Sequence, residues 1–243
     1  MALIERRTVR RVTLHTPSRR ASLVLAIEFM VEPSKEELLT AEPESIDSDA
    51  LVFPGARGDR RRHLRRSELE SAIAALPAAP LDRGIVNLLV ARGALGERQL
   101  PEAALLTIDG GMPADRWASE GRYGPEFQLA TTRSDFARVI ANGQPLELHG
   151  DNLYLTLDLS SENLPVGSLL RLGEALVQVT PQAHNGCKKW VQRFGLAPMQ
   201  MNLAPTHRHL HLRGIYLRVV ADGRVRKGDE VVVVSRGSLG APA

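Results

Sequence analysis

The residues best suited to chemistry in this sequence surround its only cysteine, Cys187, in the segment VTPQAHNGCKKWVQRFG. The pattern predicts a strand, then a loop, then a short helix that begins near Asn185 or Gly186 and ends at Phe194. Gly195 would cap that helix, because glycine readily adopts the left-handed backbone conformation found at helix C-termini. We therefore expect Cys187 in the first helical turn, directly after a loop.

This position would favour the thiolate form of the cysteine. The first turn lies at the positive end of the helix dipole, and His184, Lys188 and Lys189 add positive potential nearby. A thiolate can carry sulfur, ligate a metal or attack an electrophile. Gly186 would leave room for a ligand, because it has no side chain. The alternative is a small, buried cysteine at a strand–helix junction, and the residues alone leave both readings open.

Three histidines, His207, His209 and His211, alternate along a segment that the sequence predicts to be a strand. Alternate residues of a strand face the same side, so together with His184 and Cys187 they would be the ingredients of a zinc or iron site. No acidic side chains lie close by in the sequence to orient such ligands. We therefore favour a half-exposed strand face over a metal site.

Positive charge is concentrated in the stretch ARGDRRRHLRR, whose arginines are Arg57, Arg60, Arg61, Arg62, Arg65 and Arg66. Such a density attracts acidic partners, so one hypothesis is a non-catalytic binding or regulatory module that uses this surface. No aromatic side chains are interleaved to stack on bases, which argues against nucleic acid. The alternative is a solvated loop that leads into a helix.

The 243 residues suffice for one large β domain, or for a domain of about 150 residues with a smaller partner. One cysteine excludes a disulfide within the chain. The longest apolar run, Leu23–Val31, is interrupted by Glu28 and is far shorter than the roughly 20 residues of a membrane span. The N-terminus also lacks the apolar region of a secretory signal. We expect a cytoplasmic protein with no membrane partner.

The first 80 residues predict a small α+β region. The expected elements are strands at Val9–Leu14, Leu23–Val31 and Leu51–Phe53, and helix starts at the capping boxes of Ser34 with Glu37 and of Ser67 with Glu70. In the second helix, Leu69, Ile73 and Leu76 form an apolar stripe that ends before Pro77. The stretch LPAAPLD that follows is the predicted linker.

From Gly84 onward, short strands separated by turn residues indicate a barrel or a sandwich. Two tight hairpins are expected, with turns at Gly173–Glu174 and Asp222–Gly223. One helix should begin after Ser134 as its N-cap and end at Asn142–Gly143.

Several stretches of this region, in this order and spacing, resemble motifs of the MOSC domain, named for the C-terminal part of molybdenum-cofactor sulfurases. They are GGMPADRW at 110–117, GDNLYLTLDLSSENLPVGSLLRLG at 150–173, HNGC at 184–187 with RFG at 193–195, and RGIYLRVV at 213–220. The resemblance implies a mainly β fold, a MOSC-type β-barrel with a few short helices. It divides the chain into an α+β extension at 1–80, the MOSC domain at 81–236 and a C-terminal tail at 237–243.

The resemblance implies that Cys187 either carries sulfur as a persulfide or ligates the molybdenum of a bound cofactor, with His184 tuning the thiolate. Stand-alone relatives suggest a related reaction, the reduction of N-hydroxylated compounds. The sequence is similar to the short bacterial branch, which lacks the aminotransferase-like domain that mobilises sulfur. A sulfur donor such as a cysteine desulfurase, or an electron-donating redox protein, would then be a separate partner. The role of residues 1–80 stays open between packing and homodimerisation.

The resemblance also indicates residues that would contact the molybdenum cofactor. Asp115 and Arg116 lie on the pocket side in the family comparison, although structural turn-capping is an equal alternative. Asp151 and Asn152 follow Gly150 in a tight turn, where such residues either line a pocket or bond their own backbone.

Arg193 and Arg213 would bind the phosphate of a pterin cofactor, because a guanidinium forms two parallel hydrogen bonds to phosphate. Surface ion pairing is the alternative for both. Asn185 and Gly186 would contact the cofactor beside Cys187. The sequence contains no glycine-rich phosphate loop, so we expect no nucleotide cofactor.

Overall fold

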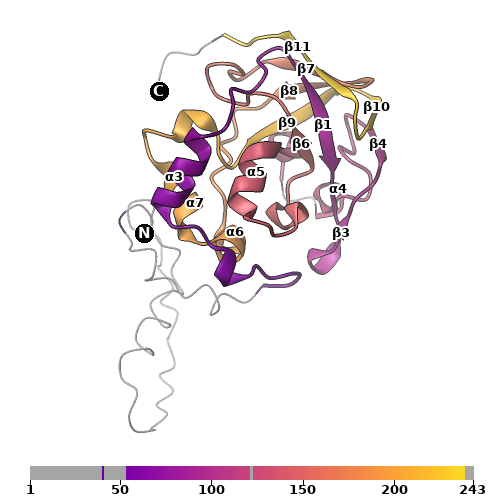
Figure 1. The fold of residues 1–243 in the computed structure, drawn as a ribbon. Helices are drawn as coiled ribbons and strands as arrows, with labels where there is room; N and C mark the ends of the chain where they lie inside the picture. Colours follow the sequence, from indigo (N-terminus) through magenta and orange to yellow (C-terminus); the bar gives the residue numbers. More distant parts are fainter. Residues whose placement is uncertain (1–39, 41–52, 121–122, 239–243) are drawn as a thin grey trace, which may run out of the picture. The chain divides into compact units, whose positions relative to one another are not determined.

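A computed structural model describes Thr40, residues 53–120 and residues 123–238, which belong to the unit formed by residues 34–243 (Figure 1). Residues 1–33 are a separate unit and lie outside the described residues. The strands predicted at Val9–Leu14 and Leu23–Val31 and the helix start at Ser34 therefore lie outside the described residues, as does most of the strand predicted at Leu51–Phe53.

Seven of the described strands close into a barrel, which confirms the mainly β architecture expected from the sequence (Figure 1). In order around the barrel they are β1 (Arg83–Leu89), β11 (Glu230–Ser235), β7 (Leu169–Leu172), β8 (Ala175–Val179), β9 (Ile215–Ala221), β5 (Leu129–Arg133) and β6 (Leu153–Leu155). Two ribbons accompany it, β4 (Ala103–Leu106) with β10 (Gly223–Arg226) and β2 (Ala91–Arg92) with β3 (Arg98–Gln99). Closure leaves the barrel without an unpaired edge.

The barrel interior is a packed apolar core built from alternate positions of its strands. In β8, Ala175, Val177 and Val179 are buried, whereas the two residues between them are partly exposed. Leu217 and Val219 repeat this pattern in β9. Because successive side chains of a strand point to opposite faces, the alternation decides which face lines the interior.

One predicted hairpin is confirmed and the other is wrong. Gly173 and Glu174 form a two-residue turn between β7 and β8, with Gly173 at a φ of 53°. Asp222 and Gly223 instead mark a corner, because β10 pairs with β4 and not with β9. A Cβ on Gly223 would lie 2.3 Å from the Ala175 nitrogen, so a close backbone approach explains this glycine.

The parallel pair β5 and β6 is joined by α5 (Ser134–Ala141) and by the 3-10 turn η5 (Leu146–His149). As predicted, the helix ends at Asn142, which has a left-handed φ of 45°. It begins with Ser134 itself, because the preceding arginine occupies the cap position that we expected for the serine. This connection leads through Gly150 into β6 and carries the turn on which the candidate site is built.

Four helices gather on one side of the barrel in Figure 1: α3 (Arg66–Ala74), α5, α6 (Lys188–Phe194) and α7 (Leu196–Leu203). α3 contacts both α5 and α7, and it buries Leu69 and Ile73 of the predicted stripe. Its cap lies two residues before the predicted Ser67. Glu68, rather than Glu70, accepts the hydrogen bond from the cap nitrogen, at 2.8 Å.

Within the described residues, members of the arginine cluster form local ion pairs, Arg61 with Asp59, Arg65 with Glu68 and Arg66 with Glu70. None of the helices in the described part of the chain is long and apolar enough to cross a membrane.

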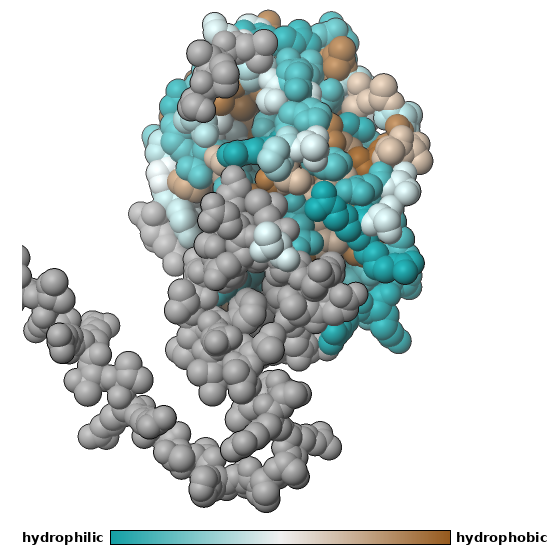
Figure 2. Space-filling view, turned by 90° about the vertical axis from the view of Figure 1, so that its left-hand side faces the viewer, coloured by the Kyte–Doolittle hydropathy of each residue, from teal (hydrophilic) through white to brown (hydrophobic). Residues whose placement is uncertain are grey.

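The face shown in Figure 2 is mostly hydrophilic, with apolar residues scattered among polar ones.

Candidate functional site

A cavity of about 400 Å³ lies beside Cys187, within the size range of small-molecule sites. Its wall combines residues that are far apart in the sequence. They include Arg92, Gly96 and Arg98 from the β2–β3 ribbon, Arg116 and Trp117 of α4 (Arg116–Glu120), His149 and Gly150, the loop from Ala183 to Cys187, Lys189, Trp190 and Arg193 of α6, and Arg213 and Tyr216 at the start of β9.

Positive charge dominates this cavity. Its cationic lining residues are Arg92, Arg98, Arg116, Lys189, Arg193 and Arg213. No aspartate or glutamate is among the lining residues in the described part of the chain. Positively charged side chains that line a concave, partly buried wall concentrate the electric field in the cavity, and this field attracts anions. The cavity is therefore suited to an anionic ligand.

Four of these arginines are held by one backbone turn, residues 147–150, which we call the carbonyl turn. Each of its four successive carbonyl oxygens accepts a hydrogen bond from a different guanidinium. Arg98 Nε donates to Glu147 (3.2 Å), Arg193 Nη1 to Leu148 (2.7 Å), Arg213 Nη2 to His149 (2.9 Å) and Arg92 Nη1 to Gly150 (3.3 Å). The last carbonyls of a helical turn lack partners within the helix and attract cations. The turn thus collects four guanidiniums around one cavity.

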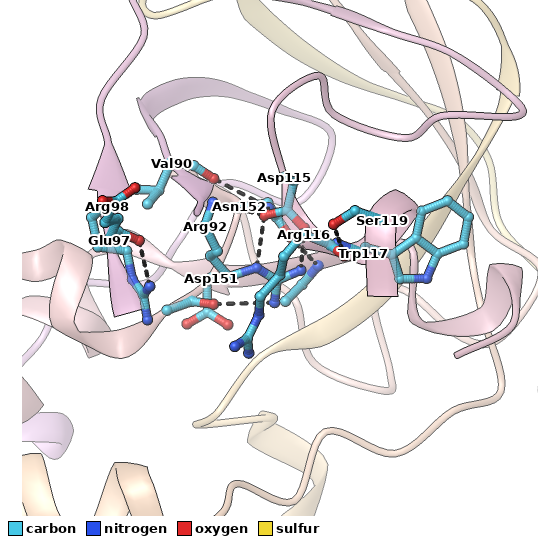
Figure 3. A network of polar contacts seen from close by, with 12 residues as sticks. Val90, Arg92, Glu97, Arg98, Asp115, Arg116, Trp117, Ser119, Asp151 and Asn152 are labelled. Carbon is cyan, nitrogen blue, oxygen red and sulfur yellow. Dashed lines mark hydrogen bonds and ion pairs between the residues drawn. The ribbon is translucent and has the colours of Figure 1, made fainter. Parts of the chain in front are cut away.

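Arg92 is paired with a buried carboxylate behind the cavity wall (Figure 3). Its Nε and Nη2 donate to the two oxygens of Asp115 at 2.8 and 2.9 Å. Asp115 also accepts from the Trp117 nitrogen at 2.9 Å at the start of α4. Burial opposes ionisation of Asp115, but the bonds to Arg92 outweigh it and lower the pKa of this carboxyl. Asp115 is thus an ionised anchor for Arg92.

Asn152 completes this network and does not reach the cavity (Figure 3). Its amide nitrogen donates to Asp115 at 2.7 Å and to the Val90 carbonyl at 3.1 Å. Its oxygen accepts from the Ala130 nitrogen at 3.0 Å. We expected this residue to line a pocket or to bond its own backbone, but it joins three distant segments instead.

Arg213 has the same type of partner. Its Nη1 donates to both oxygens of Asp151, at 2.6 and 2.5 Å, and both side chains are almost fully buried. Burial opposes the charged form of Arg213, but the Asp151 carboxylate outweighs it and raises the pKa of the guanidinium. We call Arg92 and Arg213 the inner arginines, because each is neutralised by a buried aspartate.

Arg98 and Arg193, the outer arginines, have no carboxylate partner among the described residues. Besides the carbonyl turn, Arg98 donates to the Glu97 carbonyl and Arg193 to the Ala56 carbonyl. Burial, together with the charge of Arg193, lowers the pKa of Arg98 to about 10. Burial also lowers the pKa of Arg193.

The two outer guanidiniums converge above Gly150. A Cβ on that glycine would lie 3.2 Å from Arg98 Nη2 and 3.9 Å from Arg193 Nη1. Two like charges this close repel each other, and an anion between them would relieve the repulsion. This part of the cavity therefore has an uncompensated charge that a ligand can neutralise.

Cys187 is exposed and lines the cavity, so the alternative of a buried cysteine is wrong. It is the N-cap of α6 rather than part of its first turn, because its backbone is extended (φ −150°, ψ 171°). Its carbonyl accepts from the nitrogens of Trp190 and Val191. Gly186 before it has a φ of 85°, and a Cβ there would lie 3.0 Å from both Trp190 and Met199. Close packing therefore requires this glycine.

His184 is buried between the cysteine loop and the inner arginines. Its ring packs against Tyr216 in a tilted arrangement with centroids 4.4 Å apart, and its Nε2 lies 3.8 Å from Asp151 Oδ1. Burial, followed by the charges of Arg213 and Arg92, lowers the pKa of His184 well below its ordinary value. The imidazole is neutral near pH 7, so it adds no formal positive charge beside Cys187.

Two buried polar atoms of this wall have no hydrogen-bond partner among the described residues, His184 Nδ1 and Arg213 Nε. Buried nitrogens of this kind are bonded in nearly all proteins, either to the chain or to a bound molecule. Their orphaned state is consistent with a ligand in the cavity.

His149 is a site residue that the sequence analysis missed. Its Nε2 donates to the Ala137 carbonyl at 3.0 Å, and its Nδ1 accepts from Trp190 Nε1 at 3.1 Å. Burial lowers the pKa of His149 to about 3, and Arg213 contributes to the effect. The neutral ring ties α5 and α6 to the carbonyl turn.

The structure brings most of the predicted ligand residues together. Those that line the cavity are Cys187, His184, Asn185, Gly186, Arg116, Arg193 and Arg213, whereas Asp115, Asp151 and Asn152 lie behind the arginines. Lining residues that the sequence analysis missed include Arg92, Arg98, Trp117 and Tyr216, whereas Lys189 lines the cavity near Cys187 as expected. None of these four belongs to a spacing pattern that marks a site, although Trp117 and Tyr216 lie within the MOSC-like motifs.

The histidine triplet does not form a strand. Residues Arg208–Leu210 are a 3-10 turn, and His211 has a left-handed φ of 50°. His211 Nδ1 donates to the Leu159 carbonyl, whereas the ring of His207 contacts the hydroxyl of Thr206. The described residues contain no group of three or more histidines, cysteines or acids arranged to hold a metal ion. The prediction of an alternating strand face was therefore wrong.

Comparison with known proteins gives a family for this region. A family model described as the MOSC domain matches residues 123–232. An uncharacterized protein of Bacillus subtilis (strain 168), YflK, is 36% identical over 91 residues, which are 37% of this chain and 38% of that protein. The match thus spans little more than a third of that relative's length.

Solved structures are also similar. YiiM from Escherichia coli is 25% identical, with 63% of this chain and 71% of that chain covered and a TM-score of 0.44. The YuaD protein from Bacillus subtilis is 20% identical, with 61% of this chain and 94% of that chain covered and a TM-score of 0.45. The matched residues 123–232 include the carbonyl turn, Cys187 and Arg213. Residues 123–232, which hold most of the barrel and the cysteine side of the cavity, thus match the MOSC domain family.

Proposed function

We propose that the cavity binds the molybdenum cofactor, with its phosphate on the arginines and its metal beside Cys187. The match of residues 123–232 to the MOSC family model supports a role connected with this cofactor in general. The observation that carries the finer proposal is the set of four guanidiniums held by the carbonyl turn around the cavity that contains the exposed thiol.

The residues present fit such a group. Paired guanidiniums suit phosphate, because each offers several donors in a fixed plane. The outer arginines, Arg98 and Arg193, are the phosphate ligands we propose, since their charge is not compensated by the described residues. The Cys187 thiolate would be a soft ligand for the metal. His184 Nδ1 and Arg213 Nε would supply hydrogen bonds to the bound molecule between these two ends.

The bound cofactor would supply two-electron redox chemistry, for which the reduction of an N-hydroxylated compound is the reaction we propose. The N–O bond breaks, two electrons from a separate redox protein reduce the nitrogen, and two protons enter, so that the products are the amine and water. His184 lines the same cavity as Cys187, and its neutral imidazole would orient the bound reactant through a hydrogen bond at its unpaired Nδ1. The outer arginines would hold the ligand in place throughout.

The test is the molybdenum content of the full chain, measured by elemental mass spectrometry after expression in a host that makes the cofactor. We expect a near-stoichiometric metal content in the wild type. Cys187→Ser should lose most of it while circular dichroism stays unchanged, because the thiol is exposed and not part of the packed core. Arg138→Ala, on the exposed face of α5, is the matched control for an Arg98→Ala and Arg193→Ala double variant. A metal-free wild type would contradict cofactor binding.

A second function, sulfur carriage, is favoured by the exposure of the Cys187 thiol. A sulfane sulfur must be reached by the donor and by the acceptor, and a buried cysteine would prevent both transfers. In this case a cysteine desulfurase would transfer sulfur to the Cys187 thiolate and form a persulfide. Intact-mass spectrometry would then show the mass of one added sulfur atom, removed by a reducing thiol and absent from Cys187→Ser.

A further inference from the structure

The segment of residues 54–63, which we call the N-terminal strap, crosses one edge of the cavity. It lies outside the region that matches the MOSC family model. Pro54 at its start lines the cavity, and the 3-10 turn η2 (Arg60–Arg62) near its end lies beside α6. The strap thus runs between two of the elements that carry the outer arginines.

At its first end the strap touches the turn that precedes Arg98. A Cβ on Gly96 would lie 2.5 Å from the Gly55 Cα, and a Cβ on Gly55 would lie 2.8 Å from the Gly96 Cα. Both glycines have positive φ angles, 95° and 88°. The two backbones are therefore in direct contact, which only residues without a side chain permit.

At its other end the strap holds Arg193 on several sides. Arg193 Nε donates to the Ala56 carbonyl at 3.3 Å, and the Arg193 carbonyl lies 3.2 Å from His63 Nε2. A Cβ on Gly58 would lie only 2.1 Å from the Arg193 carbonyl oxygen. The guanidinium and the backbone of one outer arginine are both fixed by this segment.

Gln144 links the strap to the same point. Its oxygen accepts from the Asp59 nitrogen at 2.7 Å, and its amide donates to the Arg193 carbonyl at 3.0 Å. Gln144 also lies in the connection that leads to the carbonyl turn. The strap, α6 and the carbonyl turn are thus joined through one buried amide.

From these contacts we propose that the N-terminal strap is part of the anion site, so that closure of the strap and anion binding stabilise each other. The inference rests on the proposed function only in requiring that the cavity binds an anion. The closed strap holds Arg193 against the like charge of Arg98, and an anion between them removes this repulsion. If the strap raises the anion affinity, linkage requires the anion to stabilise the closed strap by the same factor.

The first test compares Gly58→Ala with Gly124→Ala in the full chain, using inorganic pyrophosphate as the probe and calorimetry to measure its affinity. A Cβ on Gly58 must push the strap off Arg193, whereas a Cβ on Gly124 meets nothing within 4 Å. We expect Gly58→Ala to bind pyrophosphate about tenfold more weakly or worse, the value of one charged hydrogen bond. Gly124→Ala should bind like the wild type. Equal affinities for both variants would overturn the proposal.

The second test uses trypsin, because the strap carries Arg57, Arg60, Arg61 and Arg62 as cleavage sites. Saturating pyrophosphate should slow cleavage within the strap of the wild type severalfold. Cleavage after the exposed Arg236 should not change, and it serves as the internal control. The protection should be lost in Gln144→Leu, which removes both bonds of the amide without a change at Gly58. If pyrophosphate binds and the strap is cleaved as fast as before, the coupling is refuted while the molybdenum measurement still tests the proposed function.

Discussion

The inner and outer arginines donate to the same carbonyl turn, yet they differ in what balances their charge. Arg92 and Arg213 each face a buried aspartate, whereas Arg98 and Arg193 face only carbonyl oxygens in the described part of the chain. A buried ion pair mainly fixes structure, because removing one partner leaves a costly unpaired charge. An uncompensated cation instead keeps its capacity for a ligand. The inner pair therefore maintains the site, and the outer pair is available for binding.

The largest effect is expected from breaking an inner pair. Arg213→Ala leaves Asp151 buried without a counter-charge, so the free energy of unfolding should fall by about 3–5 kcal/mol. Urea denaturation would measure the loss. Adding Asp151→Asn should recover part of it, because the second change removes the stranded charge. A loss below about 1 kcal/mol for Arg213→Ala would contradict the structural role of the inner pair.

An intermediate effect on stability is expected at acidic pH, because His149 of the carbonyl turn must stay neutral in the folded protein. The pKa of His149 is about 3 in the folded protein and close to 6.5 in an unfolded chain, so the unfolded state binds the proton first. Stability contributed by this group is therefore lost as the pH falls from about 6.5 towards 3, by about 1.4 kcal/mol per pH unit.

Urea denaturation between pH 7 and pH 5 would measure this slope. His149→Gln retains a donor and an acceptor but does not titrate, so its stability should depend less on pH in this window. Equal slopes for the wild type and the variant would show that the imidazole is not held neutral.

The smallest effect on stability is expected at the outer pair. Arg98→Ala removes a cation that is repelled by its neighbours, so the free energy of unfolding should change by no more than about 0.5 kcal/mol. Pyrophosphate affinity should nevertheless fall roughly tenfold, because one charged donor is lost. Calorimetry and urea denaturation on the same samples would separate the two effects. If Arg98→Ala destabilised the protein as much as Arg213→Ala, the distinction between inner and outer pairs would be wrong.

The elements whose partners are close in the sequence could be predicted well. The hairpin at Gly173–Glu174 is correct because its strands adjoin and only the turn has to fit. The same reasoning failed at Asp222–Gly223, where β10 pairs with β4 more than a hundred residues earlier. A turn signal describes the backbone of two residues and carries no information about the strand that competes for pairing.

The candidate site could be predicted only where its residues fall within the family-like motifs, which include Arg116 and Arg213 as well as the cysteine segment. Cys187, His184 and Arg193 fall within the family-like motifs and line the same cavity. Arg92 and Arg98 could not be found, because nothing in their local sequence distinguishes them from surface arginines. Their role depends on the carbonyl turn, which lies about fifty residues later in the chain.

The carbonyl turn also constrains how this chain can change over time. Surface connections usually accept added residues at little cost, because the ends of a loop remain in place. The connection from α5 to β6 is different. Its carbonyl oxygens are spaced by the rise of about 2 Å per residue in one 3-10 turn, and this spacing sets the distances between the four guanidiniums that bind them. A single inserted residue between Glu147 and Gly150 would change the positions of several guanidiniums relative to Cys187 at the same time. Length variation in this connection should therefore be tolerated only together with a different ligand.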